Sequence, residues 1–409
     1  MRFQIDDEFS PLEAVLVHRP GPEIERLTHE NMKRFLFEDV PYLRRMQEEH
    51  DRFTDTMRQN GVQVFFLEDL LLDVMRSEPA RGPLLEQVCR SAGVPAIAED
   101  LAGLKFWDEA ALVEMLFAGI TADEFRQATG RRIATPGGEP HFLLPPVPNA
   151  YFCRDPAVVV HDAAISSKMH YRERVRETLL VRAVLEQHPE FSDNPITYGG
   201  TDEPTEDRPY TIEGGDVIVL SPEAVLVGAS ERTRSETIEL LAGKCFQFSH
   251  MKRVYEVPIP TERAFMHLDT VFTILDAGTV LWFSPVMDQI KYIHRYEPAG
   301  QGQAKAVRMP EERTFLDVLR DEFDMDITVV HTGGGHKPFE AREQRADGTN
   351  ALALAPRVAI TYERNERTNA ALTAQGITCI GIDDSELVRG LGGPRCMSMP
   401  LRRSSASRP

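Results

Sequence analysis

The sequence has few cysteines and no arrangement of them that marks a structural site. Five cysteines, at positions 89, 153, 245, 379 and 396, are spread over 409 residues. No two of them form a Cys-x-x-Cys pair, and none has the histidine spacing that zinc sites use. The pattern excludes a disulfide framework and a structural zinc site, so each thiol is judged alone.

Positive charge and long apolar runs are also scarce. The chain has 46 Lys and Arg against 64 Asp and Glu, a formal net charge of -18. Such a chain repels nucleic-acid phosphates and anionic membranes, whereas it attracts small cations. The apolar stretch 217–227 is interrupted by polar residues and falls short of the roughly 18 residues that span a bilayer. The acidic first residues lack the pattern of a secretion signal, so we expect a cytoplasmic protein without nucleic-acid or membrane partners.

What the chain does contain is a recurring unit of two short β-branched runs joined by a turn. Ser-Pro-Glu separates such runs in 216–228, and Asp-Ala-Gly separates them in 270–283. A stretch with helical spacing of apolar residues follows most of these pairs, as at 172–188, 234–243, 313–323 and 366–376, and a further strand often follows the helix. Five such units favour modules arranged around an axis over one open sheet. Two further pairs lie at 157–166 and 351–362, and 13–21 supplies one more strand and turn.

The segment from 68 to 130 has a different composition, rich in Leu, Ala, Met and Glu and with few β-branched runs. It reads as short amphipathic helices separated by Gly, Pro or Ser. The Pro- and Gly-rich stretch 135–149 leads back to the strand-rich part of the chain. We therefore expect one domain over 1–409, with an inserted helical subdomain and return linker at 68–146 and a frayed tail at 403–409.

Charged residues lie beside Gly, Pro or aromatic residues in several short runs at strand ends. Charges at such junctions are often solvated edges or turn caps, so position alone does not make them functional. Cys396 stands out because its Gly-Gly-Pro-Arg loop would leave the thiol open to a ligand. Cys89, Cys245 and Cys379 instead fit inert, buried thiols. The runs are 148–156, 212–221, 228–233, 265–272 and 392–400.

A thiol nucleophile needs a base and an activating environment. The alternation Met-His-Leu-Asp would place His267 and Asp269 on one face of a strand, as an acid–base group and a carboxylate. The same pair could also be a structural hydrogen-bonded pair. Asp155 and Glu213 would raise the pKa of a nearby thiol, unless a cation lies between them. A planar guanidinium held by two carboxylates would be oriented for attack on its carbon and would favour the thiolate.

These runs, in this order, resemble arginine deiminase of the guanidino-group-modifying superfamily. Thr-Gly-Gly-Gly at 332–335 and the run 347–356 belong to the same series, and the openings 16–28 and 36–53 are similar too. The resemblance therefore covers nearly the whole chain. It implies an α/β fold, a five-bladed pseudo-symmetric α/β propeller of ββαβ units with an inserted helical bundle. It also implies that no metal or organic cofactor is needed.

The resemblance assigns a role to each residue of the reacting centre. Cys396 is the nucleophile that attacks the guanidinium carbon. Asp155 and Asp269 hold the guanidinium nitrogens, and Glu213 lies beside His267 and a substrate nitrogen. His267 protonates the departing ammonia and then activates the water that hydrolyses the S-alkylthiouronium adduct.

The resemblance also assigns the amino-acid end of the substrate. Asn149, Arg174 and Arg232 would pair with the α-carboxylate, and Phe152 would pack on the apolar stem. Arg174 lies in an arginine-rich helical run, where a solvated helix face is the alternative. Leu391 departs from the pattern, because some family members have a gating arginine there.

The predicted function is hydrolysis of free L-arginine to L-citrulline and ammonia. Alternatives are a deiminase or amidinotransferase for another guanidino compound (agmatine or methylated arginine), a catalytically silent arginine-binding protein, and a papain-like hydrolase. Arg232 with Asn149 favours a substrate with a carboxylate, and the acidic cluster disfavours a papain-like site. A homo-oligomer is a further possibility, in which Leu112, Met115 and Leu116 would form contacts between copies or the core of the helical segment itself.

Overall fold

The computed structural model describes residues 1–137, 141–198, 210–248, 251–300, 303–308 and 314–404. Within these ranges five sheets share one pattern, in which two strands pair antiparallel and the middle one also pairs with a parallel third strand. The sheets comprise β19 (Met399–Arg403), β1 (Leu12–Val17) and β2 (Gln63–Phe66); β5 (Ala157–Val160), β6 (Ala163–Ser166) and β7 (Ile196–Tyr198); β8 (Val217–Ser221), β9 (Ala224–Ala229) and β10 (Arg253–Pro258); β11 (Phe272–Asp276), β12 (Thr279–Trp282) and β15 (Thr328–His331); and β16 (Leu352–Ala355), β17 (Val358–Tyr362) and β18 (Thr378–Ile382).

A helix carries the chain from the second strand of each pair to the parallel third strand, as a parallel pair requires. Between β12 and β15 the chain also forms β13 (His294–Gly300) and β14 (Gln303–Arg308), which extend the sheet of β10. The short helices α9 (Ser284–Met287) and α11 (Phe339–Arg345) lie in the connections. The crossing helices are α1 (Leu43–Gln59), α7 (Val175–Gln187), α8 (Ser235–Phe248), α10 (Phe315–Phe323) and α12 (Glu366–Ala374).

The predicted hairpins are confirmed, and their strands are buried on both faces. Every residue of β8 and nearly every residue of β9 is buried, and the two strands meet at a two-residue turn after Ser221. Continuous apolar runs of this kind are typical of strands covered on both sides. The predicted helices at 172–188, 234–243, 313–323 and 366–376 are confirmed as α7, α8, α10 and α12.

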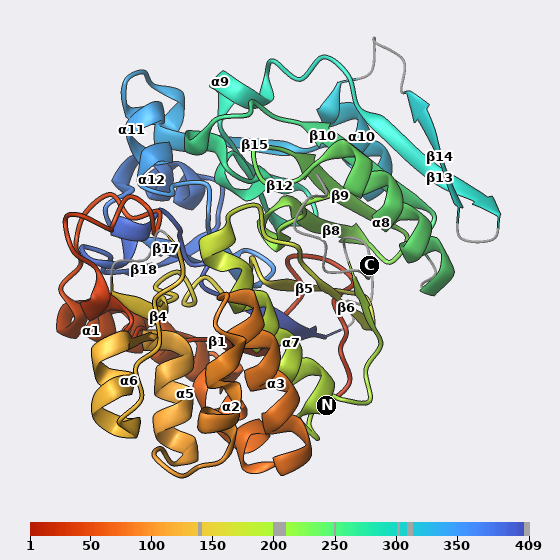
Figure 1. Cartoon of the computed structure of the whole chain (residues 1–409). Helices are drawn as coiled ribbons and strands as arrows, with labels where there is room; N and C mark the ends of the chain where they lie inside the picture. The colour runs from red at the N-terminus through yellow and green to blue at the C-terminus, as the bar shows by residue number, and fades with distance from the viewer. Residues whose placement is uncertain (138–140, 199–209, 249–250, 301–302, 309–313, 405–409) are drawn as a thin grey trace.

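A layer of helices occupies the segment for which the sequence predicts helices, and Figure 1 shows α2, α3, α5 and α6 beside one another. Thr121 begins α6 with a capping box, in which its side chain and that of Glu124 each accept a backbone N–H. Leu112, Met115 and Leu116 are buried in a core shared with α7, so they pack inside this chain and are not exposed for contacts between copies. The helices are α2 (Leu67–Arg76), α3 (Glu78–Ser91), α4 (Ala98–Ala102), α5 (Glu109–Ala118) and α6 (Ala122–Thr129). Between α5 and α6 lies β3 (Ile120–Thr121), which pairs with β4 (Phe142–Leu144) after α6.

The two ends of the chain meet in one sheet, because β19 pairs antiparallel with β1. Arg403 ends β19 and is buried, and its guanidinium donates to the carbonyls of Ser10 and Ala353. Arg403 is therefore ordered, contrary to the expected tail from 403, and residues 405–409 lie outside the described residues. None of the helices in the described ranges is both long and apolar enough to cross a membrane.

Candidate active site

The predicted nucleophile lies in a turn that leads into β19, not on a helix. The Cys396 N–H donates to Asn350 Oδ1 at 2.9 Å, and Gly393 N–H donates to the same oxygen at 3.2 Å. Tyr362 Oη fixes the loop further by donating to the Gly392 carbonyl at 2.7 Å. We expected an open thiol, but Cys396 is only 4% exposed, because this loop is packed against the protein body.

The surroundings of Cys396 keep its thiol neutral in the free protein. Burial raises the pKa of Cys396 well above its usual value, and the nearby carboxylates Asp269 and Asp155 raise it further. The Sγ lies 3.7 Å from Asp269 Oδ2, within reach of a thiol hydrogen bond. Activation of this thiol therefore requires a positive group beside it.

His267 lies before a short 3-10 helix at Leu268–Thr270 and not on the strand that the alternation predicted. Two hydrogen bonds impose the turn, because Leu268 N–H donates to Asp216 Oδ1 and Thr270 Oγ1 donates to the His267 carbonyl. The neighbouring Gly215 leaves room for the imidazole, since a Cβ there would lie 2.5 Å from His267 Nδ1. The predicted shared face of His267 and Asp269 is therefore wrong, although both residues belong to the same site.

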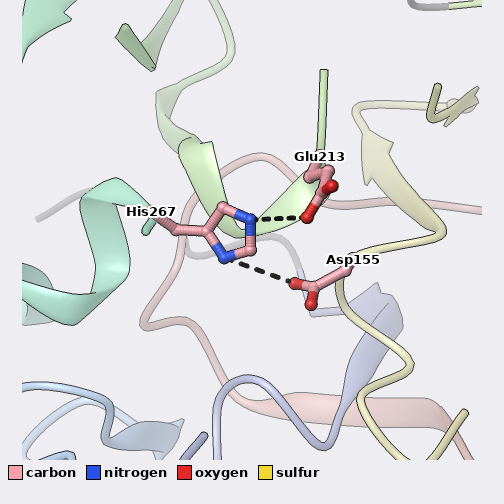
Figure 2. A group of neighbouring side chains, drawn as sticks. All are labelled: Asp155, Glu213 and His267. Atoms are coloured by element: carbon pink, nitrogen blue, oxygen red, sulfur yellow. Dashed lines mark hydrogen bonds and ion pairs between the residues drawn. The ribbon is translucent and has the colours of Figure 1, made fainter. Parts of the chain in front are cut away.

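Two carboxylates flank the His267 ring, as Figure 2 shows. Its Nε2 lies 2.9 Å from Glu213 Oε2, and its Nδ1 lies 3.7 Å from Asp155 Oδ1. Burial alone would lower the pKa of His267, but Asp155 and Glu213 raise it to about 9. His267 is thus an imidazolium near neutral pH and has a proton to donate.

Arg174 is buried among carboxylates, contrary to the solvated-face alternative. Its Nη1 donates to Asp155 Oδ2 at 2.6 Å, and its Nη2 donates to Glu177 Oε2 at 2.7 Å. Arg232 is buried as well, donating to Glu213 Oε2 at 3.0 Å. The two predicted carboxylate-binding arginines therefore form ion pairs with acidic residues of the same site.

Two carboxylate oxygens in the site are left without a hydrogen bond. Asp155 Oδ1 and Asp269 Oδ1 are buried and have no hydrogen-bond partner within the part of the chain that is described. The second oxygen of Asp269 accepts from Arg395 Nη1 at 2.6 Å. Buried acceptors are nearly always satisfied, so these two oxygens indicate where N–H groups of a ligand would bind.

A narrow cavity joins seven of the nine predicted residues, while Glu213 and Asp269 contact its lining from behind. Its free space is about 10 Å³, room for about one water molecule. Binding of a ligand as large as an amino acid therefore requires lining side chains to move. The predicted residues in the lining are Asn149, Phe152, Asp155, Arg174, Arg232, His267 and Cys396.

Phe152 and Asn149 form one wall of the cavity. Phe152 packs against the loop before Cys396 so tightly that a Cβ on Gly392 would lie 2.2 Å from the ring. Asn149 Nδ2 donates to the Phe35 carbonyl at 2.7 Å. Leu391 also lines the cavity.

Sequence reasoning missed several residues of this site. Arg263 lines the cavity although no motif marks it, and Met266 and Leu36 lie inside recognised runs in which neither side chain was given a role. Asn350 and Arg395 lie inside recognised runs, but their hydrogen bonds to Cys396 and Asp269 have no signal in the spacing.

Asp155, Glu213 and His267 also form the one group in the described ranges whose ligand atoms are close enough to hold a metal ion. Arg174 and Arg232 already pair with these carboxylates, and the pKa of His267 is raised to about 9. Metal ligation needs a neutral imidazole, so this donor set suits hydrogen-bonded organic cations better than a metal.

The raised pKa of His267 predicts a loss of stability at high pH. Its folded-state pKa of about 9 exceeds the unfolded value of 6.5, so the stabilisation is complete below about pH 6.5 and is lost as the pH rises through about 9. The shift corresponds to about 3 kcal/mol. We expect the free energy of unfolding in urea to be higher for the wild type than for His267→Asn at pH 6.5. The difference should become smaller as the pH rises to about 9 and beyond. His141, which is exposed, provides the control variant His141→Asn. A difference in free energy of unfolding between the wild type and His267→Asn that did not change with pH would contradict the raised pKa of His267.

Residues 33–403 match the model of the family described as arginine deiminase. The arginine deiminase of Listeria monocytogenes is 36% identical over 98% of both chains, and that of Borrelia recurrentis is 36% identical over 97% of both. Among solved structures, the amidinotransferase SxtG from Microseira wollei has a TM-score of 0.61 at 16% identity, covering 100% of this chain and 99% of its own. The N-terminal domain of ArgZ, an arginine dihydrolase from cyanobacteria, has a TM-score of 0.53 at 12% identity, covering 95% and 97%.

The two solved structures share the mixed α/β fold of this protein, which their low identity limits to a statement about fold. The family match covers most of the chain, and the named relatives align over nearly their full length. The chain therefore belongs to the arginine deiminase family.

Proposed function

We propose that the protein hydrolyses L-arginine to L-citrulline and ammonia. The proposal rests on one observation above all, the two buried oxygens Asp155 Oδ1 and Asp269 Oδ1 that have no hydrogen-bond partner among the described residues. Both carboxylates also act electrostatically on Cys396. A guanidinium presents N–H donors in one plane, so it would satisfy both oxygens and bring its carbon to the thiol.

Binding of the substrate cation activates the nucleophile in this mechanism. A guanidinium next to Cys396 offsets the carboxylates that raise the pKa of the thiol. Sγ then forms a bond to the guanidinium carbon. The thiol proton passes to solvent as this bond forms. His267 gives its own proton to one guanidinium nitrogen, the bond between that nitrogen and the carbon breaks, and ammonia departs to leave the S-alkylthiouronium adduct and neutral His267.

The second half of the reaction uses the same residues. After ammonia leaves, neutral His267 accepts a proton from a water molecule, whose oxygen bonds to the carbon of the thiouronium adduct. The C–S bond breaks, Cys396 leaves as thiolate and is reprotonated, and citrulline is released. Glu213, 2.9 Å from His267 Nε2, stabilises the imidazolium in both halves.

We infer that Asn149, Arg174 and Arg232 bind the α-carboxylate and that Phe152 packs on the aliphatic stem. All four line the cavity. Arg174 has to exchange its bond to Asp155 for one to the substrate. This exchange would also enlarge the cavity, which is too narrow for arginine in the free protein.

Agmatine, which lacks the carboxylate, tests this assignment. A hydrogen bond to a charged group contributes about 1.5–3 kcal/mol, so we expect kcat/KM for agmatine to fall by about 10- to 100-fold or more relative to L-arginine. The steady-state rate of ureido product formation, measured for both substrates over a range of concentrations, gives the ratio of the two kcat/KM values. Equal kcat/KM values would remove the role given to Arg232 and Arg174.

Three structural expectations accompany the function. We propose that the five sheets are the blades of a propeller, supported by the pairing of β19 with β1 at the chain ends. We also propose one catalytic domain in which 68–146 is an inserted helical subdomain. Self-association stays a prediction that light scattering tests.

The direct test is incubation of the purified protein with L-arginine, followed by colorimetric measurement of citrulline and enzymatic measurement of ammonia. We expect equal amounts of both products. Citrulline without ammonia, or no citrulline at all, would contradict the proposal. Adding a primary amine distinguishes an amidinotransferase, which would form a new guanidino compound in place of citrulline.

A further inference from the structure

A second and larger cavity lies away from the active site, between the loop that follows β1 and the helices α2 and α5. Its volume is about 330 Å³, and it shares no lining residue with the catalytic cavity. The loop is the His-Arg-Pro-Gly-Pro-Glu run at 18–23, which the reaction does not use. This cavity is therefore a separate feature of the fold, at the junction between the helical layer and the rest of the protein.

A buried histidine between two carboxylates forms one side of the cavity. His18 Nδ1 lies 2.8 Å from Glu68 Oε2, and its Nε2 lies 3.1 Å from Glu23 Oε1. The His18 ring stacks on Phe117, with the ring centroids 4.1 Å apart. Burial alone would lower the pKa of His18, but Glu68 and Glu23 raise it to about 10. The histidine is thus a fixed imidazolium that aligns both carboxylates.

Negative charge in the lining exceeds the positive charge that is available to balance it. Glu23 is 1% exposed, and its Oε2 has no hydrogen-bond partner in the described ranges. Asp69 and Glu114 line the cavity as exposed carboxylates, and no ion pair to either is found among the described residues. Arg19, the other cation in the lining, is engaged by Asp51 at 2.7 and 2.8 Å.

The arrangement of these carboxylates suits an organic cation more than a metal ion. Within the described residues, the group close enough to hold a metal is the one in the active site, so the acidic side chains here do not converge to that degree. Leu72, Val113 and Ala110 supply an aliphatic wall. An apolar wall with a few polar groups is the usual composition of small-molecule sites.

We propose that this cavity binds a small organic cation, an ammonium or guanidinium group on an aliphatic chain, through Glu23, Asp69 and Glu114. The cation forms charge-assisted hydrogen bonds with Glu23 Oε2 and with the carboxylates at the rim. The aliphatic chain packs on Leu72 and Val113. Binding weakens as salt is added, because the rim carboxylates are exposed and therefore screened.

Calorimetric titration of the full-length Cys396→Ala protein at low ionic strength tests the proposal, since this variant does not consume a guanidino ligand. The probes are 1,4-diaminobutane for the ammonium class, agmatine for the guanidinium class, and 1,4-butanediol as the neutral match. We expect the cations to bind and the diol not to bind. Whichever cation binds more tightly identifies the preferred head group.

Paired variants separate this cavity from the active site, where the same cations could also bind. In the Cys396→Ala background, Asp69→Asn with Glu114→Gln should weaken cation binding about fivefold or more, because two exposed ion pairs are lost. Glu78→Gln with Glu99→Gln removes the same charge from the helical layer outside the cavity and should leave the affinity unchanged.

The rim variants change exposed side chains, so folding is not at risk, and circular dichroism verifies it. Glu23→Gln, read together with its melting temperature, extends the test to the buried oxygen. Equal affinity of the rim variant and its parent would overturn the proposal, as would absence of binding by both cations.

Discussion

We expect citrulline formation from L-arginine to be lost when Cys396 is replaced by alanine, while the protein stays folded. The proposed reaction passes through a bond between Sγ and the guanidinium carbon, and no other thiol lines the cavity among the described residues. Removal of a nucleophile that acts as a unit with its base typically costs more than about 10⁴-fold in kcat. We expect a loss of that size in a citrulline assay.

Cys379→Ala is the matched control, because Cys379 lies on β18, is partly exposed and does not line the catalytic cavity. It should retain wild-type turnover. Comparable citrulline output from Cys396→Ala and the wild type would exclude covalent catalysis by this residue. Calorimetry separates chemistry from binding, since Cys396→Ala should still bind L-arginine through the carboxylates.

We likewise expect His267→Ala to lose turnover through a fall in kcat, with little change in the affinity for arginine. Protonation of the leaving nitrogen and activation of water both depend on this imidazole in the proposed mechanism, and each such proton transfer contributes about 10²–10⁴-fold. The carboxylates beside it keep other partners, since Glu213 still pairs with Arg232 and Asp155 with Arg174. The variant should therefore fold.

Rapid-quench measurements with radiolabelled L-arginine locate the block. We expect neither ammonia nor labelled protein from His267→Ala, because the departing nitrogen is not protonated. The exposed His141→Ala serves as control. Accumulation of labelled protein would instead restrict His267 to the hydrolytic half, and an unchanged kcat would remove it from the mechanism.

Much of the local structure could be predicted from the sequence because it depends on near neighbours. The paired strands around Pro222 and Glu223 follow from β-branched runs and a turn. The α6 helix follows from Thr121 and Glu124, which form a capping box visible in the sequence. Cys379 shows the limit, since it was expected to be buried and is partly exposed on β18.

The site itself depends on distant contacts, and there the prediction was less complete. His267 was assigned to a strand because alternation ignores Asp216, which holds the turn by accepting a hydrogen bond from Leu268, 52 residues further along the sequence. The burial of Cys396 depends on Asn350 and Tyr362, and neither contact leaves a periodic signal. The identities of the residues were enough to predict the chemistry. The burial and hydrogen bonds of each residue could be known only from the folded structure.

The pairing of Arg174 with Asp155 and Glu177 has a consequence for affinity. An unoccupied pocket with several buried carboxylates would have a large desolvation cost, and here the chain supplies its own guanidinium as a counterion. Substrate binding is then an exchange, in which one guanidinium–carboxylate contact is broken for each one formed at Asp155. The net free energy of binding is then a small difference between the contact that Arg174 loses and the contact that the substrate gains. The product carries no charge on its ureido group, so Arg174 pairs with Asp155 again and the product is released readily.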